Sequence, residues 1–366
     1  KNEIEIANNS ISEELKSAIN IAKQNIEKFH VAQKINEPII ETAPGVKCWR
    51  KAIGIEKVGL YIPGGSAPLF STILMLGIPA KLAECKEIIL CTPPNRLGEI
   101  NAAILYTASL IGITKIYKVG GAQAIAAMAY GTETVPQVYK IFGPGNQYVT
   151  KAKEQILQDG IAIDMPAGPS EVLIIADSTS IPRFVASDLL SQAEHGADSQ
   201  VILLSDNEDI IEQSITELEK QLKQLPRVEI ATKALINSKA ILLENIEECI
   251  EFSNQYAPEH LIIASENSSV YVDEIVNAGS VFLGNYSCES AGDYASGTNH
   301  TLPTNGFARN YSGVSLESFQ KKITFQELSK EGIKCIGPAI ELMAETEGLF
   351  AHKNAVSLRL NTLSND

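Results

Sequence analysis

The chain has 366 residues, of which 45% are hydrophobic and 20% are charged, as in a globular protein rather than a disordered one. Its net charge of -14 argues against nucleic acid or an anionic membrane as a partner, because both bind clustered lysine and arginine. No apolar run reaches the roughly 18 residues that cross a bilayer, and no signal-peptide pattern opens the chain, so we expect a cytoplasmic protein.

The first predicted element is a helix. Ser10 and Glu13 have the spacing of a capping box, and apolar residues recur on one face at Leu15, Ile19, Ala22, Ile26 and Phe29. His30, at the end of this amphipathic stretch, looks like an ordinary core residue.

Short β-rich runs then alternate with helical patterns. This alternation predicts βαβ units with mostly parallel sheets, and the number of runs fits two Rossmann-like domains. The expected strands are Val58–Ile62, Glu87–Cys91, Lys115–Val119, Val138–Phe142, Val172–Asp177, Gln200–Ser205, His260–Ala264 and Ser280–Leu283.

The alternation stops after about Tyr311. Helical patterns follow around Leu316–Lys330 and Pro338–Glu345, and a polar tail carries His352. Because no strand partner for this tail is apparent, we expect it to dock on another surface.

Three glycine-rich turns follow apolar runs in the first half of the chain. A strand, a glycine turn and a helix N-terminus together form an anion site, although each turn alone is also typical of plain turn chemistry. None is the dinucleotide fingerprint, but their clustering favours a nucleotide phosphate at the carboxyl ends of a parallel sheet. The turns are Pro63-Gly64-Gly65-Ser66, Gly120-Gly121-Ala122-Gln123 and Gly143-Pro144-Gly145-Asn146.

The most informative polar segment ends a predicted helix that starts at Pro182 with Ser180 as N-cap and stops at Gly196. Gln192 and His195 share a face of its last turn, where the helix dipole favours a cation. The alternative is a solvated polar helix end. The six cysteines form no CxxC pair and are expected to be reduced, so any metal would use His, carboxylate and amide ligands.

Three further segments carry histidine beside carboxylates. Glu259-His260 precedes a strand, and both side chains reach one site only if they lie in the loop before that strand. They would supply two bases for proton transfer.

The segment from Asp293 to His300 is a polar loop that suits the carboxyl edge of a sheet, or it is an ordinary solvated loop. Glu347 and His352 lie about 140° apart on one unbroken helix, so a shared site requires a stop near Gly348.

With these residues in hand, the chain resembles the histidinol dehydrogenase family, whose members are zinc enzymes of the last step of histidine biosynthesis. The resemblance covers nearly the whole chain. It departs at the N-terminus, where the family usually has several tens of residues more, and the start at Lys1 likewise indicates a fragment. The matching motifs include VGLYIPGGSAPLFST, VGGAQAIAAMAYGTETVP, KIFGPGNQYVTKAK, IDMPAGPSEVL, DLLSQAEHGADSQV, NQYAPEHL, SAGDYASGTNHTLPT and AHKNAVSLR.

The resemblance implies a set of roles. Zinc would be held by Gln192, His195, Asp293 and His352, and the acid–base pair would be Glu259 and His260. Substrate would also contact Ser170, His260, His300 and Glu347 along with the zinc ligands, and NAD+ would meet Tyr61, Gln123 and Asn146. The implied protein is a homodimer whose C-terminal tail crosses to the partner's active site.

The implied fold has two Rossmann-like domains with parallel sheets, one inserted in the other, plus a small helical C-terminal extension. We expect residues 1–60 and 172–314 to form the domain with the zinc and acid–base residues. Residues 61–171 would form the inserted NAD-binding domain, and residues 315–366 the helical region and crossing tail.

The implied reaction oxidises L-histidinol through L-histidinal to L-histidine with two NAD+. Two other functions remain open at the level of sequence. One is a zinc dehydrogenase for another small polar alcohol, such as a sulfonated diol, which Glu347 and His300 disfavour because they suit a cationic substrate. The other is a non-catalytic zinc or nucleotide-binding relative, which the intact Glu259 and His260 disfavour.

Overall fold

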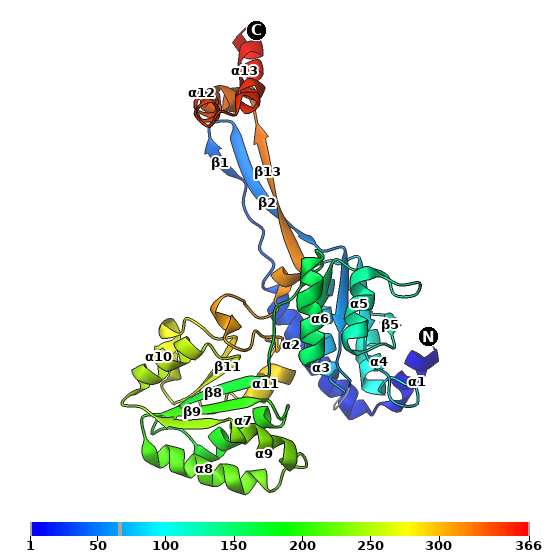
Figure 1. Cartoon of the computed structure of the whole chain (residues 1–366), viewed down its shortest axis with the longest axis vertical. Coiled ribbons are helices and arrows are strands. Elements are labelled where there is room, and N and C mark those ends of the chain that lie inside the picture. Colours follow the sequence, from blue (N-terminus) through cyan, green and yellow to red (C-terminus); the bar gives the residue numbers. More distant parts are fainter. Residues whose placement is uncertain (1, 65–67, 365–366) are drawn as a thin grey trace. The chain divides into compact units, whose positions relative to one another are not determined.

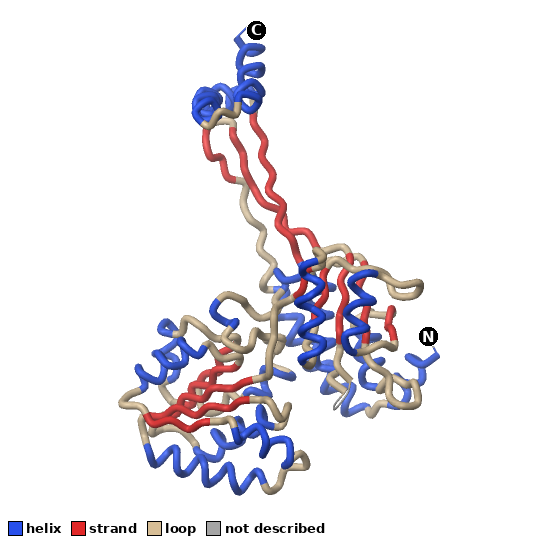
Figure 2. Tube along the Cα trace, viewed as in Figure 1, coloured by secondary structure: helices blue, strands red, loops and turns tan. Residues whose placement is uncertain are grey.

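The computed structural model describes residues 2–64 and 68–364 (Figures 1 and 2). The chain divides into two units. Unit 1 comprises Lys1–Gln33 and Ile55–Phe319, and unit 2 comprises Lys34–Gly54 and Gln320–Asp366. The predicted α/β class with parallel sheets is confirmed, and both parallel sheets belong to unit 1. Among the described residues, no helix is long and apolar enough to cross a membrane.

The first parallel sheet has the strand order β5-β4-β3-β6-β7. From β3 the chain builds outward to β4 and β5 on one side, then returns to place β6 and β7 on the other. The order therefore reverses between β3 and β6, and in such sheets ligands bind beyond the carboxyl ends of the strands at this point. The strands are β3 (Lys57–Tyr61), β4 (Glu87–Cys91), β5 (Lys115–Tyr117), β6 (Lys140–Phe142) and β7 (Ala162–Ile163).

Helices cover both faces of this sheet, because its buried strands are apolar on both sides. Alternate residues of β4 enter two different cores: Ile88 and Leu90 join one, and Ile89 and Cys91 join the other. The first core contains α1 (Asn2–Ser10), α2 (Glu13–Val31), α3 (Phe70–Leu82) and α4 (Ala102–Leu110). The second contains α5 (Gly121–Tyr130) and α6 (Gln147–Gln158).

The second parallel sheet repeats this topology, with the order β10-β9-β8-β11-β12. One face carries α7 (Pro182–Ala193), α8 (Glu208–Leu222) and α9 (Val228–Ile236), and the other carries α10 (Ile246–Tyr256) (Figure 1). The short α11 (Glu289–Tyr294) follows the last strand. The strands are β8 (Glu171–Ala176), β9 (Gln200–Ser205), β10 (Lys239–Leu242), β11 (His260–Ala264) and β12 (Ser280–Leu283).

Both ends of unit 1 pack on the first sheet, although the sequence interpretation grouped residues 1–60 with the second. Ile19 and Ile26 of α2 share a core with Val58 and Leu60 of β3. At the other end, Phe319 stacks on Phe142 of β6, with ring centroids 3.9 Å apart. Three 3-10 helices, η1 (Ser268–Glu274), η2 (Phe307–Arg309) and η3 (Leu316–Phe319), complete unit 1.

Unit 2 holds a three-stranded antiparallel sheet, ordered β1-β2-β13, and two helices that pack against each other. Its elements are β1 (Ile40–Ala43), β2 (Val46–Gly54), β13 (Gln320–Leu328), α12 (Lys330–Thr346) and α13 (Phe350–Ser364). In the sheet, Trp49 of β2 stacks on Phe325 of β13 at 5.5 Å. Between the helices, Gly337 leaves room for Leu360, whose side chain would lie 3.0 Å from a Cβ at that position.

The eight strands expected from the sequence are confirmed, with small shifts at their ends. The helix expected around Leu316–Lys330 is wrong, because β13 occupies most of this segment and pairs with β2 over its full length. The capping residue of the N-terminal helix is also corrected. Ser12, not Ser10, accepts from the Leu15 N–H at the start of α2, and the Ser10 hydroxyl donates to the Ala7 carbonyl. All six cysteines are free, as predicted.

Candidate active site

Glu259 and His260, which the sequence predicts to be an acid–base pair, lie at the amino edge of the second sheet. His260 is the first residue of β11, and Glu259 occupies the preceding loop, as the sequence required for both to reach one site. The start of β8, beside β11, orients the pair. Glu259 Oε2 accepts from the Glu171 N–H at 3.0 Å, and His260 Nδ1 lies 3.4 Å from the Glu171 carbonyl. Because a carbonyl only accepts, this contact places the proton on Nδ1 and leaves Nε2 as the basic nitrogen.

Burial shifts the pKa values of both groups so that their uncharged forms are favoured. The side chains of Glu259 and His260 are 7% and 4% exposed. Burial lowers the pKa of His260 to about 3, with His195 and His300 adding to the effect, so the imidazole is neutral near pH 7. Burial also raises the pKa of Glu259 well above its usual range, against the opposing Glu171 N–H bond. The neutral imidazole can accept a proton, and the protonated carboxyl group can donate one.

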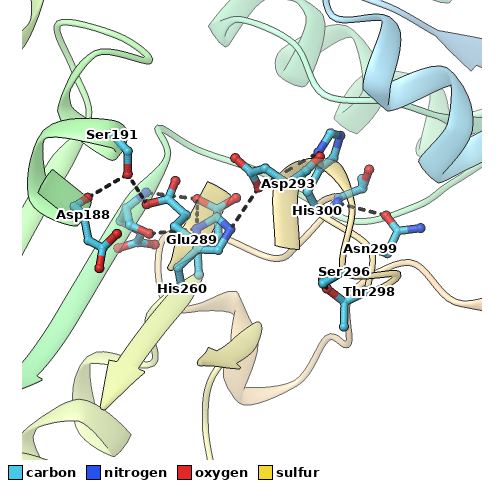
Figure 3. Close-up of polar contacts among 12 residues, drawn as sticks. Asp188, Ser191, His260, Glu289, Asp293, Ser296, Thr298, Asn299 and His300 are labelled. Atoms are coloured by element: carbon cyan, nitrogen blue, oxygen red, sulfur yellow. Dashed lines mark hydrogen bonds and ion pairs between the residues drawn. The ribbon is translucent and has the colours of Figure 1, made fainter. Parts of the chain in front are cut away.

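A compact donor cluster adjoins this pair (Figure 3). His195, Glu289 and Asp293 offer ligand atoms that all lie within 4.8 Å of one another. Asp293 Oδ1 lies 3.7 Å from His260 Nε2, so the cluster and the acid–base pair form one site. Burial raises the pKa of Asp293 to about 6, while the charge of His195 opposes the rise. The cluster therefore suits a divalent cation, whose charge would favour the ionised carboxylate.

The last turn of α7 supplies a further donor. Gln192 is fully buried, yet neither Oε1 nor Nε2 of its amide has a hydrogen-bond partner. Buried amides are almost always hydrogen-bonded, so this amide is available to a water, an ion or a ligand. The start of α7 differs from the sequence interpretation. Pro182 is its first residue as expected, but Ser180 donates to the Ala264 carbonyl instead of capping the helix.

Glu289 was not identified from the sequence. It is 1% exposed, its Oε2 accepts from the Ser191 hydroxyl at 3.3 Å, and its Oε1 has no partner. Burial raises its pKa well above the usual range, and the charge of Asp293 adds to this effect. The available signal was its place four residues before Asp293, the spacing that puts two side chains on one face of a helix.

His300 lies beside Asp293 and links α11 to α3, a helix that packs on the first sheet. Its Nδ1 lies 2.9 Å from the Asp293 carbonyl, and its Nε2 lies 3.1 Å from the hydroxyl of Thr72, the third residue of α3. The loop that carries Asp293 and His300 was expected at the carboxyl edge of its sheet. That expectation is wrong: α11 leads back from β12 to His260, at the amino edge.

The residues expected to meet NAD+ all lie at, or shortly after, the carboxyl ends of strands of the first sheet. Tyr61 ends β3, and its hydroxyl accepts from the Gly121 N–H at 3.1 Å, which links two of the glycine turns. Gln123 is exposed in the first turn of α5. Asn146 caps α6 by accepting from the N–H groups of Tyr148 and Val149. Gly65 and Ser66 of the first glycine turn lie outside the described residues.

Three expected site residues remain. Ser170 is half-buried and directly precedes Glu171. Glu347 and His352 belong to unit 2, where both are exposed. Glu347 ends α12 and His352 lies in the first turn of α13, with Gly348 between the helices at φ +73°. The helix stop that the sequence placed near Gly348 is confirmed.

Known proteins match this chain over nearly its whole length. A family model described as "Histidinol dehydrogenase" matches residues 1–360. The chain belongs to the histidinol dehydrogenase family. It is 62% identical to histidinol dehydrogenase of Bacteroides thetaiotaomicron, over 99% of this chain and 84% of that protein. The corresponding protein of Escherichia coli K12 is 57% identical, over 99% and 83% of the two chains. A crystal structure of histidinol dehydrogenase from Elizabethkingia anophelis superposes with a TM-score of 0.98 at 67% identity, covering 100% of this chain and 84% of that one.

Proposed function

We propose that this chain oxidises L-histidinol through L-histidinal to L-histidine, as an NAD-dependent histidinol dehydrogenase. The observation that carries the proposal is the buried Glu259–His260 pair beside a cluster of metal-binding side chains. Family membership supports the substrate and the pathway.

The donor set fits a zinc ion. Gln192, His195 and Asp293 would bind it, together with His352 from a C-terminal tail. The unpartnered Gln192 amide and the convergence of His195 with Asp293 support this assignment. Zinc, when bound, orients a substrate that carries an imidazole and an amine, and NAD+, when bound, accepts a hydride.

His260 and Glu259 would carry out the proton transfers. His260 Nε2 accepts the alcohol proton, because Nδ1 is held by the Glu171 carbonyl and burial keeps the ring neutral. In the second oxidation, the ionised form of Glu259 activates the water that attacks the aldehyde, and His260 again takes a proton. Ser170, His300 and Glu347 would complete the substrate contacts.

The proposed cofactor contacts are Tyr61, Gln123 and Asn146, at the carboxyl edge of the first sheet. The reversal of strand order between β3 and β6 supports this position. We further propose a cytoplasmic homodimer in which the tail of one subunit completes the partner's site.

One measurement tests the function. NADH formed per histidinol consumed is followed by ultraviolet absorbance, alongside the metal content of the purified protein. A ratio near two, with zinc present, is expected for the four-electron reaction. A ratio near one means that the aldehyde escapes. Absence of turnover with histidinol, in protein that holds zinc, would reject the substrate and direct attention to other small polar alcohols.

A further inference from the structure

Two buried side chains of opposite charge, Lys153 and Asp164, bind the backbone of Gly143 in the first-sheet domain. Gly143 directly follows β6 and opens the loop that leads to α6. Its N–H donates to Asp164 Oδ2 at 2.8 Å, and its carbonyl accepts from Lys153 Nζ at 2.9 Å. Lys153 and Asp164 also pair with each other through Asp164 Oδ1. Both backbone groups of one residue are thus held by two opposite charges.

The pair ties together three parts of the fold. Lys153 lies in the second turn of α6, Asp164 directly follows β7, and Gly143 lies between β6 and α6. The two charged side chains are only 4% and 1% exposed. Since a buried ion pair contributes little net stability compared with apolar residues of the same volume, stability alone does not explain this arrangement.

The backbone that the pair holds has an unusual conformation. Gly143 has φ +133°, a region that side-chain-bearing residues rarely adopt. A Cβ at this position would lie 2.1 Å from the Tyr61 carbonyl oxygen, so the loop passes directly against the end of β3. The contact joins the carboxyl ends of β3 and β6, where the strand order reverses. The position of the turn that ends in Asn146 therefore depends on how Gly143 is held.

We propose that Lys153 and Asp164 are positioning residues that fix the Gly143–Asn146 turn in the shape that receives the dinucleotide. The inference rests on the proposed function, because it assigns a supporting role at the same cofactor site. Neither side chain touches the cofactor in this proposal. They act through the Gly143 backbone. Because their charges neutralise each other, the turn binds the dinucleotide through its own peptide groups and Asn146.

The test uses the full-length protein with zinc bound. The double variant Lys153→Met/Asp164→Asn removes both charges at once, so neither is left buried alone. We expect the KM for NAD+ and the Kd for NAD+ to rise roughly tenfold or more, because a small displacement of a positioning group weakens binding steeply. The KM for histidinol and the zinc content should stay within about twofold of the unchanged protein. Asp164→Asn alone leaves Lys153 buried without a counter-charge, so it should lower the melting temperature more than the double variant does, and it should also raise the Kd for NAD+.

The matched control is Lys140→Met. Lys140 is a half-buried lysine of β6, and its Nζ donates to the Ser318 carbonyl at 2.9 Å and not to Gly143. Its loss should lower the melting temperature without changing the Kd for NAD+. If the double variant does not fold, Lys153→Arg decides the question by the same NAD+ binding measurement, because it keeps the charge and alters only the contact with the Gly143 carbonyl.

Failure of the positioning role and failure of the proposed function give different results. An unchanged Kd for NAD+ in a folded variant overturns the positioning role. Equal increases in the KM for NAD+ and for histidinol also overturn it, because they indicate a general structural defect. Failure of the unsubstituted protein to oxidise histidinol rejects the proposed function instead, while direct NAD+ binding still tests the role of the ion pair.

Discussion

The two parallel sheets of unit 1 share one strand order but present opposite edges to their candidate sites. The first sheet offers its carboxyl edge, where glycine turns bring backbone groups close together, as at Gly143 and Tyr61. The second sheet offers its amino edge, where Glu259 and His260 lie buried at the start of β11. One topology therefore supports two kinds of chemistry. Peptide groups suit the binding of a preformed cofactor, whereas proton transfer needs buried ionisable side chains with shifted pKa values.

The sharpest test of this contrast is His260→Asn in the second sheet. The amide cannot accept the alcohol proton, so we expect kcat for histidinol to fall roughly 10²–10⁴-fold, the usual effect of losing a general base. Steady-state kinetics and metal analysis measure the result. Zinc content should not change, and loss of zinc would mean that His260 is a ligand rather than a base.

Glu259→Gln separates the two oxidations at the same edge. Only the second one needs an activated water, so oxidation of histidinal should fall roughly 10²-fold or more. Oxidation of histidinol should fall much less. The two substrates are supplied separately and NADH formation is compared. Equal losses would assign Glu259 to the whole cycle or to the fold.

A mixing experiment asks whether the second-sheet site is complete within one chain. His352→Asn and Gln192→Ala should each lower zinc occupancy, but only His352→Asn should be rescued by another subunit. If a tail crosses between subunits, combining His352→Asn with His260→Asn chains creates mixed dimers with one intact site. Random pairing should then restore about a quarter of the unmutated activity. Absence of recovery, with subunit exchange verified by mass, would place His352 in its own chain's site.

The contact between Thr72 of α3 and His300 is tested by Thr72→Val. The change removes the hydroxyl that His300 Nε2 meets at 3.1 Å and keeps the volume of the side chain. We expect kcat/KM for histidinol to fall about tenfold, the cost of roughly 1.4 kcal/mol for an unpartnered buried imidazole nitrogen. Thr72→Ser retains the hydroxyl and should restore most of the activity. Similar kinetics for both variants would show that the hydroxyl does not orient His300.

The smallest effect is expected for Asn146→Ala at the first sheet. Loss of the helix cap should lower the free energy of unfolding by about 1 kcal/mol. Asn146→Asp keeps a cap for α6 but brings a negative charge toward the cofactor phosphates. Chemical denaturation should show Asn146→Asp as stable as the original, while its Kd for NAD+ rises. Unchanged NAD+ binding in both variants would limit Asn146 to its capping role.

Local sequence patterns were sufficient for much of the fold. The eight expected strands form where apolar β-rich runs occur, because a strand buried on both faces needs such a run whatever its partner. The placement of Glu259 in the loop before β11 followed from the alternation of side chains along a strand. The helix stop at Gly348 followed from glycine's access to positive φ.

These local patterns could not predict contacts between residues far apart in the sequence. β13 was taken for a helix, because its partner β2 lies near the other end of the sequence and a strand exposed on both faces carries few apolar residues. The period-two placement of Ile323 and Phe325 was the available signal. The Thr72–His300 contact spans 228 positions, and no local period predicts it.

The sequence by itself determined the residue types of the candidate site and the elements that carry them. The tertiary structure decided which edge of each sheet carries a site, added Glu289 to the donor cluster and paired Lys153 with Asp164 around Gly143. The physical reason is that backbone propensity and apolar periodicity act over a few residues. Burial of a charge or an amide depends on which distant side chains come to surround it.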